Sequence, residues 1–171
     1  MKEKFLNIRS LFLVLVAGTM LTACQKDKDN TTNDLVGVWT AGTITADTQV
    51  GGKPLIQYFT DLGYSAADAQ LYSNLFTTTI QQAFSGQITF KSDNTYTTNF
   101  GGQNDSGTWT LSPDGKQLTI DSSTDNPFVL NIESLTKNQL VVNWNETDNA
   151  DINGDNTPEN ITVKLRMTLT K

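Results

Sequence analysis

Apolar and polar residues alternate over residues 86–120, and this alternation limits the fold more than any other feature of the sequence. It begins at Ile88 and Phe90, is interrupted at Ser92-Asp93-Asn94, and resumes over residues 96–100. A period of two buries one face of a β-strand and leaves the other in water. The stretch therefore predicts a β-hairpin with its turn at residues 92–94.

The same period continues after the Gly101-Gly102 break. Residues 108–111 alternate, Leu118 and Ile120 follow, and Pro113-Asp114-Gly115 lies between them. Proline presets φ, aspartate bonds to its own backbone, and glycine tolerates a positive φ, so this tripeptide is typical of a tight turn. The sequence thus predicts further antiparallel strands on both sides of it.

Other segments raise the count to about eight strands. The first begins at Leu35, the alternation returns from Pro127, and the last strand covers residues 161–169. In this last strand the apolar residues point to one face: Ile161, Val163, Leu165, Met167 and Leu169. Eight strands close a small barrel around side chains or one small ligand. We expect an all-β, antiparallel barrel that forms a single domain over residues 35–171.

A helical segment, at about residues 53–84, interrupts the β-pattern between the first and second strands. Its first helix ends at Gly63, and Ser65 with Asp68 is typical of the cap of a second helix. Apolar residues recur at helical spacing in both helices: Leu55, Tyr58, Phe59 and Leu62 in the first, and Tyr72, Leu75, Phe76, Ile80 and Ala83 in the second. Such short amphipathic helices need a surface to cover, so the insertion must pack on the barrel.

The N-terminus has the order of a secretory signal. Basic residues precede a short apolar run, and Leu21-Thr22-Ala23-Cys24 closes it with small residues. This tetrapeptide resembles the bacterial lipobox, which implies a signal peptide over residues 1–23 and an acylated Cys24 that attaches the protein to a membrane. The apolar run is too short to span a bilayer as a helix.

After Cys24, every residue as far as residue 34 is polar or charged. We therefore expect residues 24–34 to form a flexible tether between lipid and domain. The lysines and acids directly after Cys24 resemble the export signal of some Gram-negative lipoproteins. The resemblance implies an outer membrane lipoprotein in the cell envelope of a Gram-negative bacterium, either periplasmic or surface-exposed. A charged run of this kind is also typical of a plain solvated linker.

Composition excludes several classes of function. Without the first 23 residues, nine basic and 17 acidic residues remain, a net charge of −8, so we expect no nucleic acid partner. The chain has no histidine, and Cys24 is its one cysteine. Serine–histidine chemistry, a cysteine nucleophile and His- or Cys-ligated zinc are therefore excluded, and we expect no enzymatic activity and no catalytic residues.

Gly37-Val38-Trp39 resembles the Gly-x-Trp at the start of the first strand of lipocalins. The strands and turns that follow, including residues 87–100, 106–116 and 135–140, resemble the small lipocalin-like domains of bacterial lipoproteins. The resemblance implies a calycin-like barrel that binds a small, apolar ligand, although it identifies neither the ligand nor its binding residues. The alternative is a barrel filled by its own side chains, which acts as a structural or interaction module of the envelope.

The same resemblance implies two further features. The first interstrand loop of lipocalins folds over the open end of the barrel, so the helical insertion is either a lid or a pair packed outside or at the base. A basic residue in lipocalins packs across the tryptophan of the first strand, and Arg166 or Lys164 fits that role; otherwise both are solvated charges. Because Trp39, Trp109 and Trp144 alternate with polar residues, we expect them in the core rather than at a sugar-binding face.

Residues 151–159 form the sharpest local motif. Oxygen-bearing side chains recur at alternate positions: Asp151, Asn153, Asp155, Thr157 and Glu159. Glu146 and Asp148 lie nearby, and no basic residue occurs over residues 145–160. Such a loop can coordinate Ca²⁺, which would relieve its self-repulsion, although the match to an EF-hand loop is partial. The alternative interpretation is a solvated acidic hairpin loop.

Overall fold

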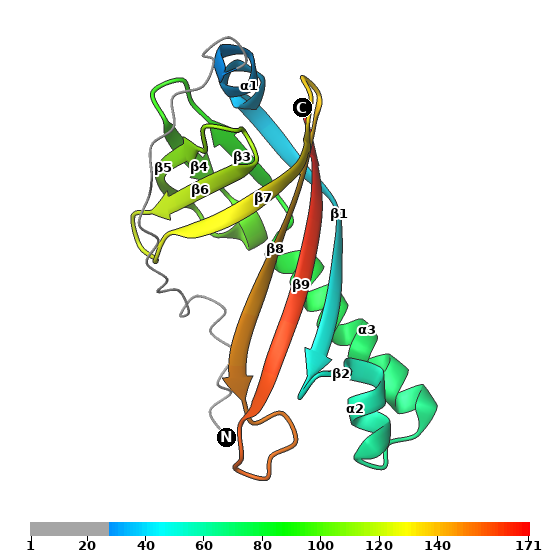
Figure 1. Cartoon of the computed structure of the whole chain (residues 1–171). Coiled ribbons are helices and arrows are strands. Elements are labelled where there is room, and N and C mark those ends of the chain that lie inside the picture. The colour runs from blue at the N-terminus through cyan, green and yellow to red at the C-terminus, as the bar shows by residue number, and fades with distance from the viewer. Residues whose placement is uncertain (1–27) are drawn as a thin grey trace.

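The computed structural model describes residues 28–171, with side chains from residue 32 onward. Its strands form one antiparallel sheet, in which β1 and β3–β9 close an eight-stranded barrel because β1 (Gly37–Val50) pairs with both β3 (Gln87–Phe90) and β9 (Glu159–Thr170) (Figure 1). This architecture confirms the predicted all-β barrel of about eight strands.

The predicted hairpins and turns of the middle strands are confirmed. The strands there are β4 (Thr95–Thr98), β5 (Asp105–Leu111), β6 (Gln117–Ser122) and β7 (Phe128–Leu135). Each pairs with its neighbour in the chain, and the short helix η1 (Phe100–Gly102) lies between β4 and β5. At Gly107 an added Cβ would lie 2.0 Å from the carbonyl oxygen of Asp121, so only glycine permits β5 to approach β6 this closely.

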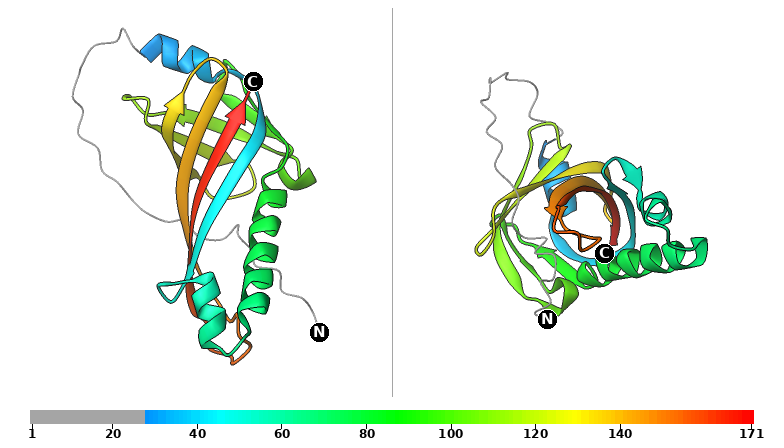
Figure 2. Two further views of the ribbon diagram at one scale, coloured as in Figure 1. Left: turned by 90° about the vertical axis from the view of Figure 1, so that its right-hand side faces the viewer. Right: turned by 90° about the horizontal axis from the view of Figure 1, so that it is seen from below.

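Three strands are much longer than the others. β1 pairs with β3 only over residues 37–40, and β8 (Gln139–Ala150) pairs with β7 only over residues 140–143. Both nevertheless continue beside β9, as far as Val50 and Ala150. The lower half of the molecule is therefore a curled three-stranded sheet that extends beyond the closed barrel (Figures 1 and 2).

The helical insertion packs against the side and lower end of this extension (Figure 2). The two-residue strand β2 (Lys53–Pro54) pairs with the end of β1 and leads into α2 (Leu55–Asp61), which α3 (Ala66–Ala83) follows. α3 contributes Ile80 to the core, and its Phe76 packs against that core. The sequence left open whether the insertion is a lid or a helix pair packed on the barrel. The structure shows the packed helix pair.

The helix α1 (Lys28–Leu35) lies at the opposite end of the molecule, where β1 begins (Figure 1). Where the sequence predicts a flexible tether over residues 24–34, the structure has this helix from residue 28 onward. Leu35 is fully buried, and tertiary packing of this end therefore orders a stretch whose composition favours disorder. The predicted signal peptide, Cys24 and the start of the tether lie outside the described residues.

Candidate functional site: the helical hairpin

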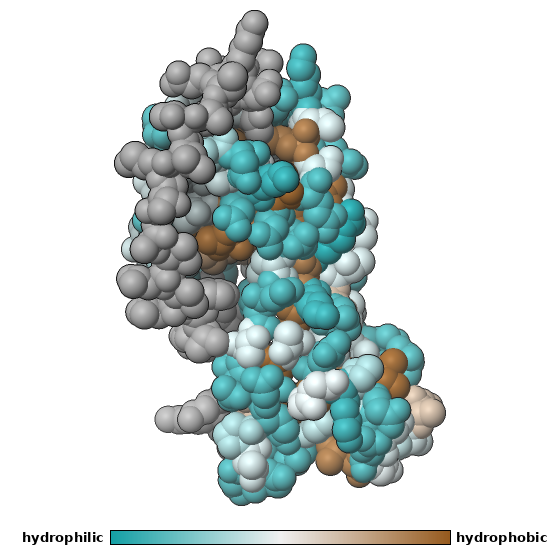
Figure 3. Space-filling model, in the orientation of Figure 1, coloured by the Kyte–Doolittle hydropathy of each residue, from teal (hydrophilic) through white to brown (hydrophobic). Residues whose placement is uncertain are grey.

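Exposed apolar side chains concentrate on one element, the hairpin of α2 and α3. The described residues include eight large hydrophobic side chains that are exposed, and six of them belong to this hairpin. These six define the hairpin surface: Ile56, Leu62, Tyr64, Leu71, Tyr72 and Leu75. Brown patches mark this region at the lower right of Figure 3. A concentration of exposed apolar side chains on one element of a folded domain is typical of an interaction site.

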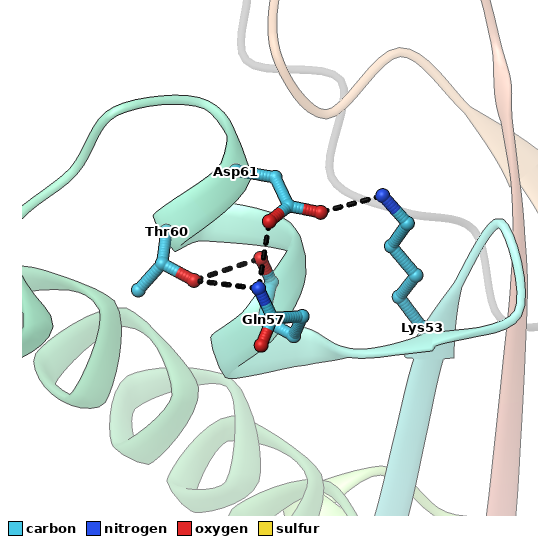
Figure 4. Close-up of polar contacts among 4 residues, drawn as sticks. All are labelled: Lys53, Gln57, Thr60 and Asp61. Atoms are coloured by element: carbon cyan, nitrogen blue, oxygen red, sulfur yellow. Dashed lines mark hydrogen bonds and ion pairs between the residues drawn. The ribbon is translucent and has the colours of Figure 1, made fainter.

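Local sequence explains why the hairpin forms. Gln57 and Lys53 both donate to the carboxylate of Asp61, at 2.6 and 2.5 Å, which ties the start of α2 to its end (Figure 4). Gly63, with φ near +91°, reverses the chain after α2. The hydroxyl of Ser65 then accepts a hydrogen bond from the backbone N–H of Asp68, which confirms the predicted cap of the second helix.

Aromatic packing joins the two helices. Phe59 of α2 contacts Tyr72 of α3 with ring centroids 5.3 Å apart, and Tyr64 of the connecting turn contacts both rings at 5.4–5.6 Å. Tyr58 packs edge-on against Phe59 at 5.7 Å. These contacts hold the hairpin as one unit, so its exposed residues are presented on a fixed scaffold.

α3 has two apolar faces, and only one of them is covered. The inner face contributes Ile80 and Ala69, which are 4% and 0% exposed, whereas Leu71 and Leu75 are 53% and 54% exposed. The apolar stripe predicted for the second helix is thus only partly covered, since Tyr72 and Leu75 are 42% and 54% exposed. Leu71 precedes Ile80 by two and a half helical turns, and a helix of 3.6 residues per turn places them on opposite sides. The spacing of Leu71 and Ile80 is the sequence signal that α3 has a second apolar face.

The hairpin carries little charge of its own, but an acidic loop adjoins it. Asp68 is the one charged residue of α3, and Asp61 of α2 is neutralised by Lys53. The hydroxyl of Tyr58 donates to Glu159 Oε1 at 2.5 Å, which attaches α2 to the loop over residues 151–159. Burial and this carboxylate raise the pKa of Tyr58 to about 12, so the phenol remains a donor at neutral pH.

The predicted calcium ligands bond mainly to their own loop. Both carboxylate oxygens of Asp151 accept from the backbone N–H groups of residues 154–156, and Asp155 accepts from Thr157. Glu159 accepts from the backbone N–H of Ile152 within the loop and from the hydroxyl of Tyr58 on α2. Within residues 28–171 no group of three or more Asp, Glu, His or Cys side chains is placed to hold a metal ion. Calcium binding by this loop stays a prediction.

The interior of the closed barrel is packed with large side chains. Trp39 and Leu118 are fully buried, and Phe90, Tyr96 and Trp109 are 2% exposed. Their burial shows that these large side chains pack closely within the core. All three tryptophans lie in the core, as predicted.

One carboxylate faces inward at the edge of this core. Glu146 accepts a hydrogen bond from Trp144 Nε1 at 3.0 Å, and it lies on the part of β8 that β7 no longer covers. Burial raises its pKa above the ordinary value, and repulsion from Asp148 adds to the effect. Sequence reasoning placed Glu146 in the acidic loop region, whereas the strand register turns it toward Trp144.

Comparison with known proteins identifies the fold family. A family model described as a lipocalin-like domain matches residues 35–142. The chain belongs to the lipocalin-like domain family. This confirms the resemblance seen in Gly37-Val38-Trp39.

A crystal structure of a DUF4847 family protein from Bacteroides vulgatus is also similar to this lipocalin-like chain. The similarity covers 80% of this chain and 92% of that protein, with 14% sequence identity and a TM-score of 0.40. No curated protein matches the chain. Within residues 28–171, no helix combines the length and apolar character that a membrane span requires.

The basic residue over the tryptophan of this lipocalin-like barrel is not the predicted one. Lys171 places its Nζ 4.6 Å from the centre of the Trp39 ring and donates to the carbonyl oxygens of Asp34 and Val36. Arg166 instead pairs with Glu133 at 2.7 Å, on the polar face of β9. Register explains the error, because β9 brings Thr170 opposite Thr40 and leaves Arg166 five residues farther along β1, opposite Thr45.

Proposed function

We propose that this lipocalin-like protein is a non-catalytic module of the cell envelope, anchored by lipid on Cys24, that binds another protein through its hairpin surface. The observation that carries the proposal is the position of six of eight exposed large hydrophobic residues on one helical hairpin. The chain's lack of histidine, together with its single cysteine at position 24, supports a binding role rather than catalysis.

The geometry of the long strands supports a contact surface far from the anchor. Cys24 precedes Lys28 by four residues, which span about 14 Å at most, so an acylated Cys24 keeps α1 close to the bilayer. β1 then runs 14 residues from the α1 end to the hairpin, or about 40 Å at strand spacing. A protein of the outer membrane, periplasmic or surface-exposed, would thus present the hairpin away from its own membrane.

Acylation has a direct test. We expect cells that express the full chain to incorporate labelled palmitate into it, and the Cys24→Ser variant to lose both the label and its recovery in the membrane fraction. If the unlabelled variant were still recovered in the membrane fraction, the lipid anchor on Cys24 would be contradicted. The contact proposal would then no longer depend on the position of the membrane.

The contact role is tested by site-specific photo-crosslinking in cells. A photoreactive residue at position 75 should form adducts with another protein, whereas the same residue at position 129 should not. Val129 is the matched control because it is 46% exposed but lies on β7 of the barrel. Adducts at neither position, or equally at both, would contradict a contact role for the hairpin.

Binding of a small apolar ligand is the second candidate, and membership of the lipocalin-like family favours it. Because Trp39, Phe90 and Tyr96 fill the barrel, a ligand would have to displace core side chains. Native mass spectrometry of the protein purified from its own cells tests this. A retained mass of a few hundred daltons that survives a calcium chelator would support a carrier, and a bare polypeptide mass would contradict it.

A further inference from the structure

We infer that the hairpin surface takes a basic amphipathic segment of a partner protein, one with an apolar face flanked by lysine or arginine. This inference rests on the proposed contact function and names the chemistry of the partner. Its apolar part follows from Leu71 and Leu75, which lie one helical turn apart on the uncovered face of α3. Two such residues form the ridge that a second helix packs against.

The basic part follows from the charges beside α2, the other helix of the hairpin. Tyr58 hydrogen-bonds to Glu159, and Asn153 and Asp155 are close enough to Tyr58 to influence its pKa. The loop over residues 151–159, which contains three carboxylates and no basic residue, therefore borders α2. The one basic residue within the hairpin segment, Lys53, is paired with Asp61. An apolar surface with an acidic border is complementary to an apolar face with a basic border.

Charge also argues against the other occupants. A second copy that met this surface through a two-fold axis would bring two acidic loops toward each other, in a protein whose formal net charge is already −6. An anionic bilayer would be repelled by the same loop. An acidic partner would lose the complementarity that a basic one gains.

A defined peptide tests the inference on the purified full chain. The probe is a fluorescein-labelled 18-residue helix built from leucine and lysine, with leucine on one face, and its matched control carries glutamate in place of every lysine. We expect the lysine peptide to bind at least about tenfold tighter than the glutamate peptide, with an affinity that falls as salt rises.

Variants of the protein locate the binding site. Leu71→Gln with Leu75→Gln should weaken binding about tenfold, because both side chains lose apolar contact, and Val129→Gln should leave it unchanged. Asp155→Asn should weaken it about threefold, and Asp121→Asn, on β6 of the barrel, serves as the charge control. The exposure of these positions means that folding should survive, which circular dichroism checks; Leu75→Ser alone provides a milder second variant.

Three outcomes would overturn the inference. Equal affinity for both peptides would show that the partner need not be basic. An equal loss of binding in the control variants would show that the peptide does not bind at the hairpin surface. A dimer in sedimentation that the Leu71→Gln and Leu75→Gln changes dissociate would assign the surface to a second copy. If position 75 crosslinks in cells but an excess of the lysine peptide does not compete, the inference fails while the contact function stands; if position 75 gives no adduct, the contact function itself fails.

Discussion

Lys171 shows how a single side chain joins the two ends of this fold. It lies over Trp39, and an added Cβ at Gly37 would come within 2.9 Å of its Cε atom. Gly37 also has φ near +141°, which favours glycine. The glycine and the tryptophan of Gly-x-Trp thus have separate roles: one leaves room for the lysine and the other stacks beneath it.

We expect Lys171→Ala to lower the melting temperature by about 3 °C, or about 1 kcal/mol, because a cation–π contact and two hydrogen bonds are lost. Arg166→Ala should change it by less than about 1 °C, since Arg166 and Glu133 form an exposed pair with side chains 51% and 34% accessible. Differential scanning calorimetry of the two variants checks this. A larger loss for Arg166→Ala would contradict the assignment of the tryptophan cover to Lys171.

The contribution of Glu146 to the stability of the fold should change with pH in the direction opposite to that of most carboxylates. Its raised pKa means that the folded state binds the proton more tightly than the unfolded state. Its favourable contribution is complete below the ordinary pKa and is lost as the pH rises through the raised value. Glu146→Gln should therefore raise the melting temperature at pH 7 by about 2 °C, with little difference from the parent at pH 4.

Glu133→Gln is the control for that measurement. Hydrogen bonds from Asn143 and Arg166 lower the pKa of Glu133, so its contribution is present at neutral pH and is lost as the pH falls through the lowered value. The variant should be less stable than the parent at pH 7. If both glutamine variants shifted stability in the same direction at pH 7, the assigned environment of Glu146 would be wrong.

At the scale of elements, the hairpin and the acidic loop depend on each other through Tyr58. Tyr58→Phe keeps the ring against Phe59 but removes the hydrogen bond to Glu159, and we expect a loss of about 1 kcal/mol with faster hydrogen exchange in α2. Tyr64→Phe, in the same aromatic cluster, is the matched control. Equal effects of the two variants would show that the Tyr58–Glu159 bond does not join these elements.

The loop itself tests the calcium prediction. Titration calorimetry at millimolar calcium should give a weak binding signal together with a higher melting temperature, and Asp155→Asn should reduce both. Magnesium at the same ionic strength is the control for screening of the acidic charge. Without heat or a melting shift, the loop is a solvated turn held by the bonds between Asp151 and its own backbone.

Individual elements also show which parts of the structure can be predicted from sequence. The last strand was predictable because every second residue of β9, from Ile161 to Leu169, is buried, and a strict period of two has one interpretation. Ser65 was predictable because capping is local. Which of the two apolar faces of α3 is covered was not predictable, because both contain leucine or isoleucine and only tertiary contact decides between them.

At the scale of the whole molecule, closure depends on residues that are farthest apart in sequence. β9 pairs with β8 along its length and with β1 from Thr40 to Val50. The position of Lys171 and the order of α1 follow from this closure, so neither could be inferred from local patterns. The packed interior likewise depends on how side chains from many strands meet, which no single segment encodes.

The matched segment, residues 35–142, should therefore not fold alone. It lacks β9 and the lower part of β8, and without them the edges of β1 and β8 and much of the core would be exposed. We expect this fragment to show neither cooperative unfolding nor dispersed amide signals in NMR, in contrast to the fragment 28–171. A cooperative melting transition of the shorter fragment would contradict the role assigned to β9.

The long strand β1 also has a mechanical consequence. The chain before α1 and the hairpin connect to opposite ends of β1, so a pulling force between them would run along this strand. β9 pairs beside β1 over most of that length, and its hydrogen bonds lie across the direction of the force. The load would thus be carried in shear by many bonds at once rather than opening them one by one, and this arrangement suits a link under tension.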